Sequence, residues 1–259
     1  MKNTYPSSPL ATLHSAKSGR GSKDEVIYTH LNTAITRNLL EPGTKLPEDA
    51  LAETFKVSRT SIRKVLQRLA HEGLVDIRLN HGASVAQPTL KEARDLFASR
   101  QIIECGAMKA IVKHATKDDL ALLQRISNDE IQAEKNNDRA ASIFLSGRFH
   151  IELIRISTNE IVTGFLSDLV ARTSLVIATF ASPNSCACQP SRHKEIINLL
   201  KEKKEAEAEQ WMQLHLQEVE DSVISQSGKN HTEDLRSILD RVAHELNAPS
   251  LQKNKETPK

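Results

Sequence analysis

Residues 57–69 constrain the fold of this chain more than any other stretch, because they predict an amphipathic helix with a cationic outer face. The apolar side chains are spaced at i, i+3, i+4 and i+7, so they form one stripe that can be buried. These apolar residues are Ile62, Val65, Leu66 and Leu69. The opposite face carries Arg59, Thr60, Arg63, Lys64 and Gln67. Such a helix packs on one side and presents the other to an anionic partner.

A shorter helix is expected directly before this one. Residues 46–55 suit it, and only Lys56 and Val57 remain as a connection before Ser58, which is a favoured N-cap residue. This order of helix, tight turn and helix is the helix-turn-helix arrangement.

Two short strands are expected after the second helix. Residues 74–78 and 83–86 have strand character, and residues 79–82 join them as a hairpin with Gly82 at its tip. A hairpin in this position predicts a small β wing.

Positive charge is concentrated in this region. Residues 56–78 contain six Lys or Arg and two acids, a local net charge of +4 in a chain whose total is +2. Arg and Lys side chains suit phosphates and guanine edges in the major groove, while Ser and Thr at a helix start suit the DNA backbone. The candidate DNA contacts are Ser58, Arg59, Thr60, Ser61, Arg63, Lys64, Gln67, His81 and Gly82. The alternative is an ordinary amphipathic helix with a solvated basic face.

After Pro88 the sequence predicts a bundle of long amphipathic helices with few glycines and almost no strand signal. The expected helices are approximately 90–114, 117–136, 138–156, 160–180, 189–203 and 206–225, followed by a weaker one at 232–246. With one Trp and two Tyr in the whole chain, the core of such a bundle is aliphatic. The fold class is therefore mainly α: an N-terminal winged helix-turn-helix and a C-terminal all-α bundle.

This pattern divides the chain into four parts. We expect a flexible basic N-terminal arm or disordered leader at 1–23, a DNA-binding domain at 24–88, an effector-binding and dimerisation domain at 89–229, and a C-terminal extension at 230–259. No continuous apolar run of a signal peptide or of a membrane span is expected, which predicts a cytoplasmic protein without a membrane partner. Three cysteines, two of them in Cys186-Ala187-Cys188, favour reduced thiols with an incidental or structural role; metal binding and oxidant sensing are the alternatives.

Three histidines lie on different predicted helices of the bundle. Neutral imidazoles of His150, His193 and His215 would together suit Zn²⁺, Ni²⁺ or a similar divalent ion with an open position for a ligand. Spacing alone favours three unrelated histidines, because ten occur in the chain and their convergence cannot be read from sequence.

A family resemblance changes that weighting. Residues 24–88 resemble the winged helix of the GntR superfamily of bacterial transcription regulators, on Glu41-Pro42-Gly43, Leu51-Ala52-Glu53, Val57-Ser58-Arg59, Ile62-Arg63 and Glu72-Gly73-Leu74-Val75. The departure is Lys56, where the family usually has Gly. Residues 90–222 resemble the FCD ligand-binding domain of the FadR branch, on Arg100-x3-Glu104, Phe149-His150, Ser157-Thr158-Asn159, His193 with Ile196, and His215.

The resemblance implies a metal site and an effector site. In the family the three histidines bind a divalent metal together with a carboxylate four residues before the first of them, but Ser146 occupies that position here, which weakens the metal site. The implied effector-binding residues are Arg100, Glu104, Ser146 and Asn159, with Arg100 as a clamp for a carboxylate or other anion. Two alternatives remain: a cavity suited to a neutral or heterocyclic effector, and Arg100 as a simple intrahelical partner of Glu104.

These features predict a homodimeric, ligand-responsive repressor of a catabolic operon that reads an inverted repeat in double-stranded DNA. The alternatives are a metal-dependent hydrolase or lyase that uses the three histidines, and a nucleoid-type binder without sequence preference. A general base and a His-Glu-x-x-His motif are both missing from the sequence, which disfavours the hydrolase.

Overall fold

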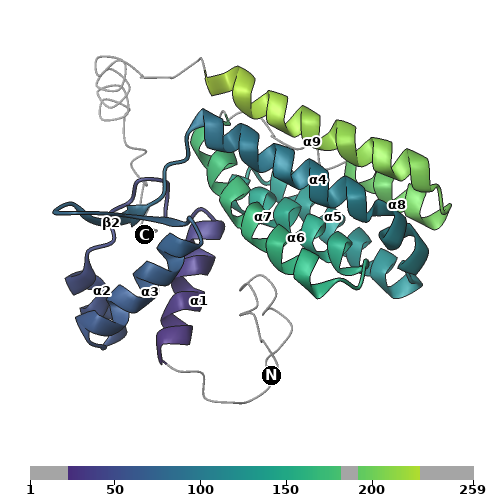
Figure 1. The fold of residues 1–259 in the computed structure, drawn as a ribbon. Helices are drawn as coiled ribbons and strands as arrows, with labels where there is room; N and C mark the ends of the chain where they lie inside the picture. The colour runs from purple at the N-terminus through teal and green to yellow at the C-terminus, as the bar shows by residue number, and fades with distance from the viewer. Residues whose placement is uncertain (1–22, 182–191, 228–259) are drawn as a thin grey trace, which may run out of the picture. The chain divides into compact units, whose positions relative to one another are not determined.

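The computed structural model describes residues 23–181 and 192–227 (Figure 1). Its first part is a small helical domain with a two-stranded sheet. The elements are, in chain order, α1 (Lys23–Thr36), α2 (Glu48–Phe55), α3 (Arg59–His71), β1 (Val75–Arg78) and β2 (Gly82–Val85). The predicted helix-turn-helix and β wing are both present, so the fold prediction for this part is confirmed.

The apolar stripe of α3 forms the centre of this domain's core. Ile62, Leu66 and Leu69 are no more than 1% exposed, and α1 and β1 pack against the helix that carries them. Burial of each such aliphatic side chain contributes roughly 1.5–3 kcal/mol to folding. The two strands pair antiparallel, with Val75 opposite Val85. The stripe predicted from sequence spacing therefore determines how α3 is oriented and which of its faces stays outside.

The turn between α2 and α3 depends on two local features. Lys56 ends α2 in the left-handed region, at φ 52° and ψ 52°, and its backbone N–H is directed at the last carbonyls of α2. A non-glycine residue pays roughly 1–2 kcal/mol for that conformation, which is the strain expected where the family usually has Gly. Ser58 then caps α3, because its Oγ accepts a hydrogen bond from the backbone N–H of Ser61 at 3.2 Å.

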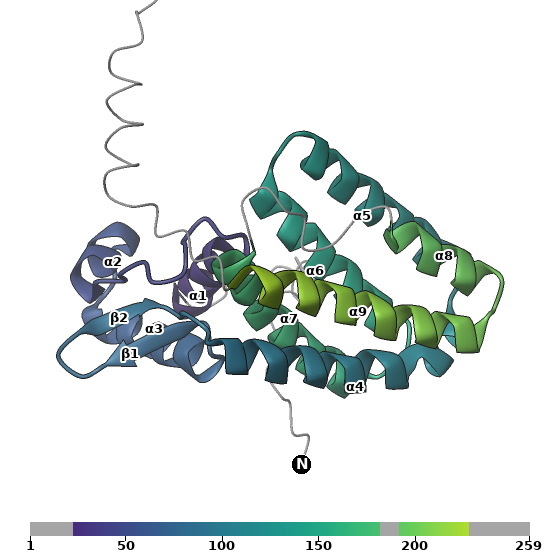
Figure 2. The same ribbon diagram turned by 90° about the horizontal axis from the view of Figure 1, so that it is seen from above.

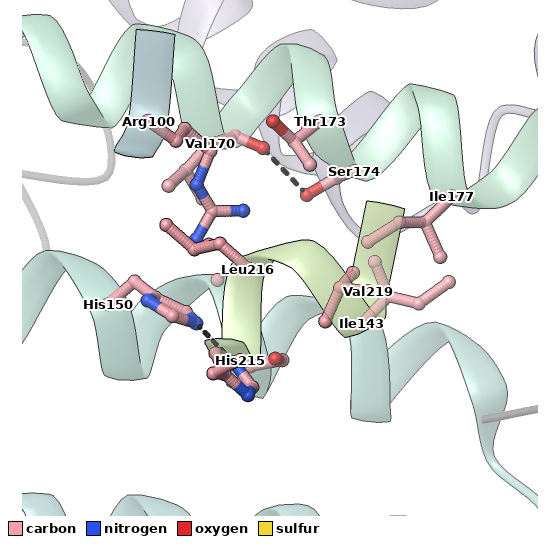
Figure 3. A pocket seen from close by; sticks show the side chains of 12 residues that line it. Arg100, Ile143, His150, Val170, Thr173, Ser174, Ile177, His215, Leu216 and Val219 are labelled. Atoms are coloured by element: carbon pink, nitrogen blue, oxygen red, sulfur yellow. Dashed lines mark hydrogen bonds between the residues drawn. The ribbon is translucent and has the colours of Figure 1, made fainter. Parts of the chain in front are cut away.

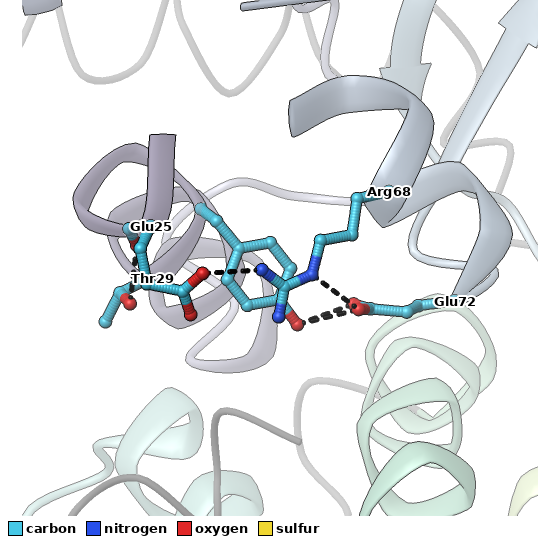
Figure 4. Close-up of polar contacts among 5 residues, drawn as sticks. Glu25, Thr29, Arg68 and Glu72 are labelled. Carbon is cyan, nitrogen blue, oxygen red and sulfur yellow. Dashed lines mark hydrogen bonds and ion pairs between the residues drawn. The ribbon is translucent and has the colours of Figure 1, made fainter. Parts of the chain in front are cut away.

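A group of polar contacts fastens α3 to α1 (Figure 4). The Arg68 guanidinium lies over the Tyr28 ring, 3.4 Å from its centroid, and donates to Glu25 at 2.7 Å and to Glu72 at 3.4 Å. The Tyr28 hydroxyl donates to Glu72 at 2.7 Å. Partial burial and the Glu72 carboxylate raise the pKa of Tyr28 far above its usual range, so this hydroxyl stays protonated. Arg68 is thus a structural cation, unlike the other basic residues of α3.

The second part of the described chain is an all-helical bundle (Figure 2). Its elements are α4 (Leu90–His114), α5 (Lys117–Lys135), α6 (Arg139–Arg155), α7 (Glu160–Phe180), α8 (His193–Lys201) and α9 (Glu205–Ser227). Helix α4 packs against α7 and α9, α5 packs against α6 and α8, and α6 packs against α7. This arrangement brings four helices that are distant in sequence, α4, α6, α8 and α9, around one interior.

Local capping explains why the bundle helices begin where the sequence predicts. Thr89 and Thr116 each form a capping box with the acid three residues later, Glu92 and Asp119. Asn159 caps α7 by accepting from the backbone N–H of Val162 at 3.2 Å. Helices α4 and α7 consequently begin and end at the predicted residues.

The expectation that the chain has no apolar run of membrane-spanning length needs correction. Helix α7 is long and apolar enough to span a membrane by length and composition alone. Its most apolar 18-residue window has a mean hydropathy of 1.6, and 56% of that window is buried inside the bundle. The polar residues on α7 include Ser167 and Ser174, whose hydroxyls donate to carbonyls one turn earlier. We therefore interpret α7 as the central core helix of the bundle.

Several sequence predictions lie outside the described residues. They concern residues 1–22 of the N-terminal arm, Cys186 and Cys188, the start of the helix predicted at 189–203, and the C-terminal extension with its helix at 232–246.

Candidate functional site

The side chains predicted to contact DNA from α3 lie along its outer face. Those that are exposed are Arg59, Thr60, Arg63, Lys64 and Gln67, together with the cap residue Ser58. Ser61, the partner of that cap, is partly buried. The face begins at the N-terminus of α3, where free backbone N–H groups and the helix dipole favour an anion. Position, charge and exposure together suit a DNA backbone and a major groove.

Two acids at the start of α2 engage the arginines of this face. Arg63 forms a bidentate pair with Glu48, with Nε to Oε1 at 3.1 Å and Nη2 to Oε2 at 2.8 Å. Arg59 forms an ion pair with Asp49. All four side chains are at least 34% exposed. Exposed pairs of this kind add little to stability, so an incoming phosphate or base can replace the acids at small cost.

The tip of the wing carries the other two predicted contacts. His81 and Gly82 are both exposed, and Gly82 opens β2 at φ 72°, a conformation that favours glycine. The backbone N–H of His81 donates to the carbonyl of Arg78 at 3.0 Å and closes the turn. The tip is thus a well-defined turn with its polar side chain in solvent.

The three histidines come together inside the bundle. His150 on α6, His193 on α8 and His215 on α9 are buried, and one ligand nitrogen from each lies within 4.8 Å of the others. The Nε2 atoms of His150 and His215 are 3.2 Å apart. The His193 ring stacks on Phe149 with 4.0 Å between centroids, which restrains its orientation. Sequence spacing alone favoured three unrelated histidines, and the fold shows instead that they converge.

Two buried carboxylates lie behind this cluster. The Nδ1 of His150 is 2.5 Å from Oε2 of Glu104 on α4, and the Nδ1 of His193 is 2.6 Å from Oε2 of Glu130 on α5. With a carboxylate as acceptor, each Nδ1 carries the proton and donates. The lone pair of each ring then lies on Nε2, the nitrogen available to a metal.

Burial and charge determine the protonation of the cluster. Burial lowers the pKa of His150 and lowers that of His215 well below its usual range, with a further contribution to His215 from His193. Burial alone would raise the pKa of Glu104, but Arg100 and His150 outweigh it and bring the value to about 2. At neutral pH His150 and His215 are therefore neutral beside the ionised carboxylate of Glu104, which is the protonation state in which a histidine binds a metal.

A pocket adjoins two of the histidines (Figure 3). Its polar end is formed by Arg100, Ser146, His150 and His215. The remaining lining is mostly aliphatic, with the hydroxyls of Thr173 and Ser174. Arg100 donates from Nε to Glu104 at 2.7 Å, while its buried Nη2 has no hydrogen-bond partner among the described residues. A buried guanidinium nitrogen without a partner is costly and indicates a site for an anionic ligand.

Close packing of α6 on α7 limits the depth of this pocket. Gly147 on α6 faces Val170 on α7, and a Cβ added at Gly147 would lie 2.7 Å from Cγ1 of Val170. Both residues line the pocket. Only the absence of a side chain at position 147 allows the two helices to approach this closely.

The residues predicted for the effector site separate into two groups. Arg100 and Ser146 line the pocket, and Glu104 stands directly behind Arg100 and His150. Asn159 does not belong to the pocket lining, because its side chain caps the N-terminus of α7. Arg100 and Glu104 form the intrahelical pair that was the alternative to an anion clamp. This pair leaves Nη2 of Arg100 available.

Sequence reasoning missed Glu130, Glu48 and Asp49. Glu130 had a usable signal, because it falls in the apolar stripe of α5 and a carboxylate in such a stripe needs a buried partner. That buried stripe is Leu123, Ile126, Ser127, Glu130 and Ala133. The two acids of α2 gave no comparable signal, because acids in the first turn of a helix are common.

Comparison with known families explains why the cationic face of α3 and the histidine cluster occur in one chain. Residues 23–85 match the bacterial regulatory proteins of the gntR family, and residues 95–218 match the FCD domain. This chain belongs to the GntR family. The two matches fall on the domain that carries α3 and on the bundle that carries the histidines.

Relatives of this GntR protein are named as transcription regulators. It is 26% identical over 203 residues to the HTH-type transcriptional repressor RspR of Escherichia coli (strain K12), which covers 77% of this chain and 88% of that protein. It is 27% identical over 239 residues to the HTH-type transcriptional repressor NanR of Salmonella arizonae, covering 82% and 89%.

Solved structures show the same fold. A GntR transcriptional regulator from Rhodococcus sp. RHA1 has a TM-score of 0.72 at 20% identity, covering 79% of this chain and 99% of that one. McbR/YncC of E. coli has a TM-score of 0.68 at 19% identity, covering 82% and 100%. The gntR and FCD matches, together with relatives that are named as regulators and not as enzymes, make the GntR protein a DNA-binding, ligand-responsive transcription regulator. The hydrolase interpretation of its histidines has no support.

Proposed function

We propose that this regulator is a homodimeric repressor of a catabolic operon, released or engaged by a small anionic metabolite that binds beside a divalent metal in the helical bundle. The observation that carries the DNA part of the proposal is the exposed cationic face at the start of α3. Two such faces, related by a two-fold axis, would enter successive major grooves of an inverted repeat. His81 and Gly82 of each wing would lie near the flanking minor groove.

The histidine cluster fits a divalent ion. It offers three buried imidazoles whose ligand nitrogens lie within 4.8 Å of one another, a donor set that suits Zn²⁺, Ni²⁺ and similar ions. Ser146 adds only a neutral hydroxyl, so water or the effector would complete the coordination. A bound ion would supply a Lewis-acidic position for an anionic effector.

The pocket supports an effector with an anionic head and a small apolar body. The unpartnered Nη2 of Arg100 suits a carboxylate, and the aliphatic side chains beyond it suit a short carbon chain. Such an effector changes transcription only if it binds the DNA-competent and DNA-incompetent forms of the dimer with different affinities.

A homodimer is supported by an exposed apolar pair on α7. Ile161 is 66% exposed and Phe165 is 61% exposed, one turn apart on the same face. A second copy of the chain would cover this pair, as expected for a protein that reads an inverted repeat.

The direct test compares binding to DNA from upstream of the protein's own gene with binding to random DNA of equal length, by fluorescence anisotropy over a salt series. We expect the upstream fragment to bind at least about 1,000-fold more tightly, a typical ratio for specific regulators. Equal affinities with a steep salt dependence would instead indicate a sequence-independent binder and contradict the proposal.

A further inference from the structure

Glu130 is a buried carboxylate with one partner. Its side chain is fully buried on α5, and Oε2 lies 2.6 Å from Nδ1 of His193. Its other oxygen, Oε1, has no hydrogen-bond partner within residues 23–181 and 192–227. Burying a carboxylate costs several kcal/mol unless nearby positive charge compensates for it. An aliphatic side chain at this buried position would avoid that free-energy cost.

Glu104 provides the internal comparison. It is equally buried, but Arg100 bonds to it at 2.7 Å in addition to His150 at 2.5 Å. No Lys or Arg of the described chain lies within ion-pair distance of Glu130. Glu104 therefore has a guanidinium as its second partner, whereas Glu130 has no Lys or Arg partner among the described residues.

The geometry relates Glu130 to the histidine cluster. Glu130 holds Nδ1 of His193, and Phe149 stacks on the same ring, so the ring is fixed by a hydrogen bond and by a face contact. The other nitrogen of this ring is Nε2. A cation at that nitrogen would place positive charge on the far side of the ring from the carboxylate.

We infer that Glu130 is a positioning and charge-balancing residue for a divalent cation held by His150, His193 and His215. The inference rests on the metal site of the proposed function and adds a fourth, non-ligating residue to it. Glu130 accepts from Nδ1 of His193 and so leaves the Nε2 lone pair to the cation, and its carboxylate supplies negative charge that three metal-bound imidazoles lack.

The experiment measures Zn²⁺ affinity of the full chain, purified without an affinity tag and stripped with a chelator, by competition with a chromophoric chelator. We expect Glu130→Gln to weaken Zn²⁺ binding by about 10-fold to 100-fold, the usual cost of losing such a partner, and Glu130→Ala to weaken it at least as much. The absorption spectrum of the Co²⁺-loaded protein should change in the same variants, because it reports the ligand geometry directly.

Glu152→Gln is the matched control, since Glu152 is also a buried bundle carboxylate but pairs with Arg155 at 2.8 Å. It should leave Zn²⁺ affinity within about twofold of wild type. Equal losses in the two Gln variants, or wild-type affinity and spectrum in Glu130→Gln, would overturn the inference while leaving the metal site intact. If wild-type protein binds no Zn²⁺, the proposed metal site falls and the inference falls with it.

Thermal unfolding in chelator shows whether each variant folds. Should Glu130→Gln not fold, Glu130→Asp takes its place, because it keeps the charge but draws the carboxylate away from Nδ1. A loss of about threefold to tenfold is then expected, and unchanged affinity overturns the inference.

Discussion

At the residue scale, Arg63 combines two roles that compete for one guanidinium. Its side chain is 59% exposed, and its planar guanidinium has the geometry that pairs with a guanine edge. In the protein without DNA, Nε and Nη2 both bond to Glu48. The ion pair keeps the fork extended along the helix surface. If Arg63 contacts a guanine as proposed, binding to DNA would exchange one bidentate partner for another.

Replacing Arg63 with Ala should weaken operator binding by about 10-fold to 100-fold, corresponding to the 1–3 kcal/mol of one bidentate base contact. The measurement is anisotropy with operator and random DNA. Arg125→Ala, which removes an exposed arginine from α5, is the control and should bind operator normally. Wild-type affinity in Arg63→Ala would remove this residue from the reading face.

At the element scale, the first turn of α2 lies against the first turns of α3 and brings two acids to its arginines. Glu48 and Asp49 neutralise part of the cationic face without burying it. A negative pair in this position repels phosphate as well as holding the arginines, so α2 lowers affinity for any DNA and leaves discrimination to base contacts.

The double variant Glu48→Gln, Asp49→Gln should therefore bind random DNA about threefold to tenfold more tightly at low salt, with a smaller gain on the operator. Glu53→Gln, an exposed acid in the last turn of the same helix, controls for net charge. A parallel loss of affinity on both DNAs would mean that the acids chiefly orient the arginines.

Elements built by local chemistry were predictable from sequence, and contacts between distant elements were not. The stripe of α3 and the caps Thr89 and Thr116 depend on residues within one or two turns, so their helices were correctly placed. The convergence of the three histidines depends on how α6, α8 and α9 pack, which spacing does not encode. Glu130 had a signal in the stripe of α5, but its partner His193 could not be predicted for the same reason, and Asn159 was assigned to a pocket although its side chain caps α7.

At the scale of the whole molecule, the proposed metal site would link metal binding to folding, because its three histidines come from three separate helices. A cation bound only by the folded form adds stability that grows with its concentration, about 2.7 kcal/mol at 100 times the dissociation constant. This makes thermal stability a readout of the histidine cluster that does not depend on DNA.

Zn²⁺ should therefore raise the melting temperature of the wild-type protein by several degrees and leave that of the double variant His193→Ala, His215→Ala unchanged. The measurement is differential scanning calorimetry of tag-free protein with and without the ion. His114→Ala removes an exposed histidine from the end of α4 and should retain the full shift. A shift of equal size in the double variant would place the ion elsewhere.

Assembly is the other property of the whole molecule that the described surface addresses. If the protein is the dimer that we propose, Ile161→Glu with Phe165→Glu should convert it to a monomer by light scattering and reduce operator affinity more than about tenfold, since one reading face would be lost from each complex. Ile102→Glu, on an apolar side chain of α4 that is 78% exposed, is the matched control. If only the control becomes monomeric, the interface lies on α4.

The absence of a side chain at Gly147 limits how the pocket of this regulator can change to accept another ligand. A methyl group at position 147 would push α6 and α7 apart and move His150 together with α6. Gly147 therefore sets both the distance of His150 from the other imidazoles and the part of the cavity lining where α6 and α7 meet. More room for a bulkier ligand would therefore come from a shorter side chain elsewhere in the lining, at Ile143, Ile177 or Val219, none of which belongs to the histidine cluster.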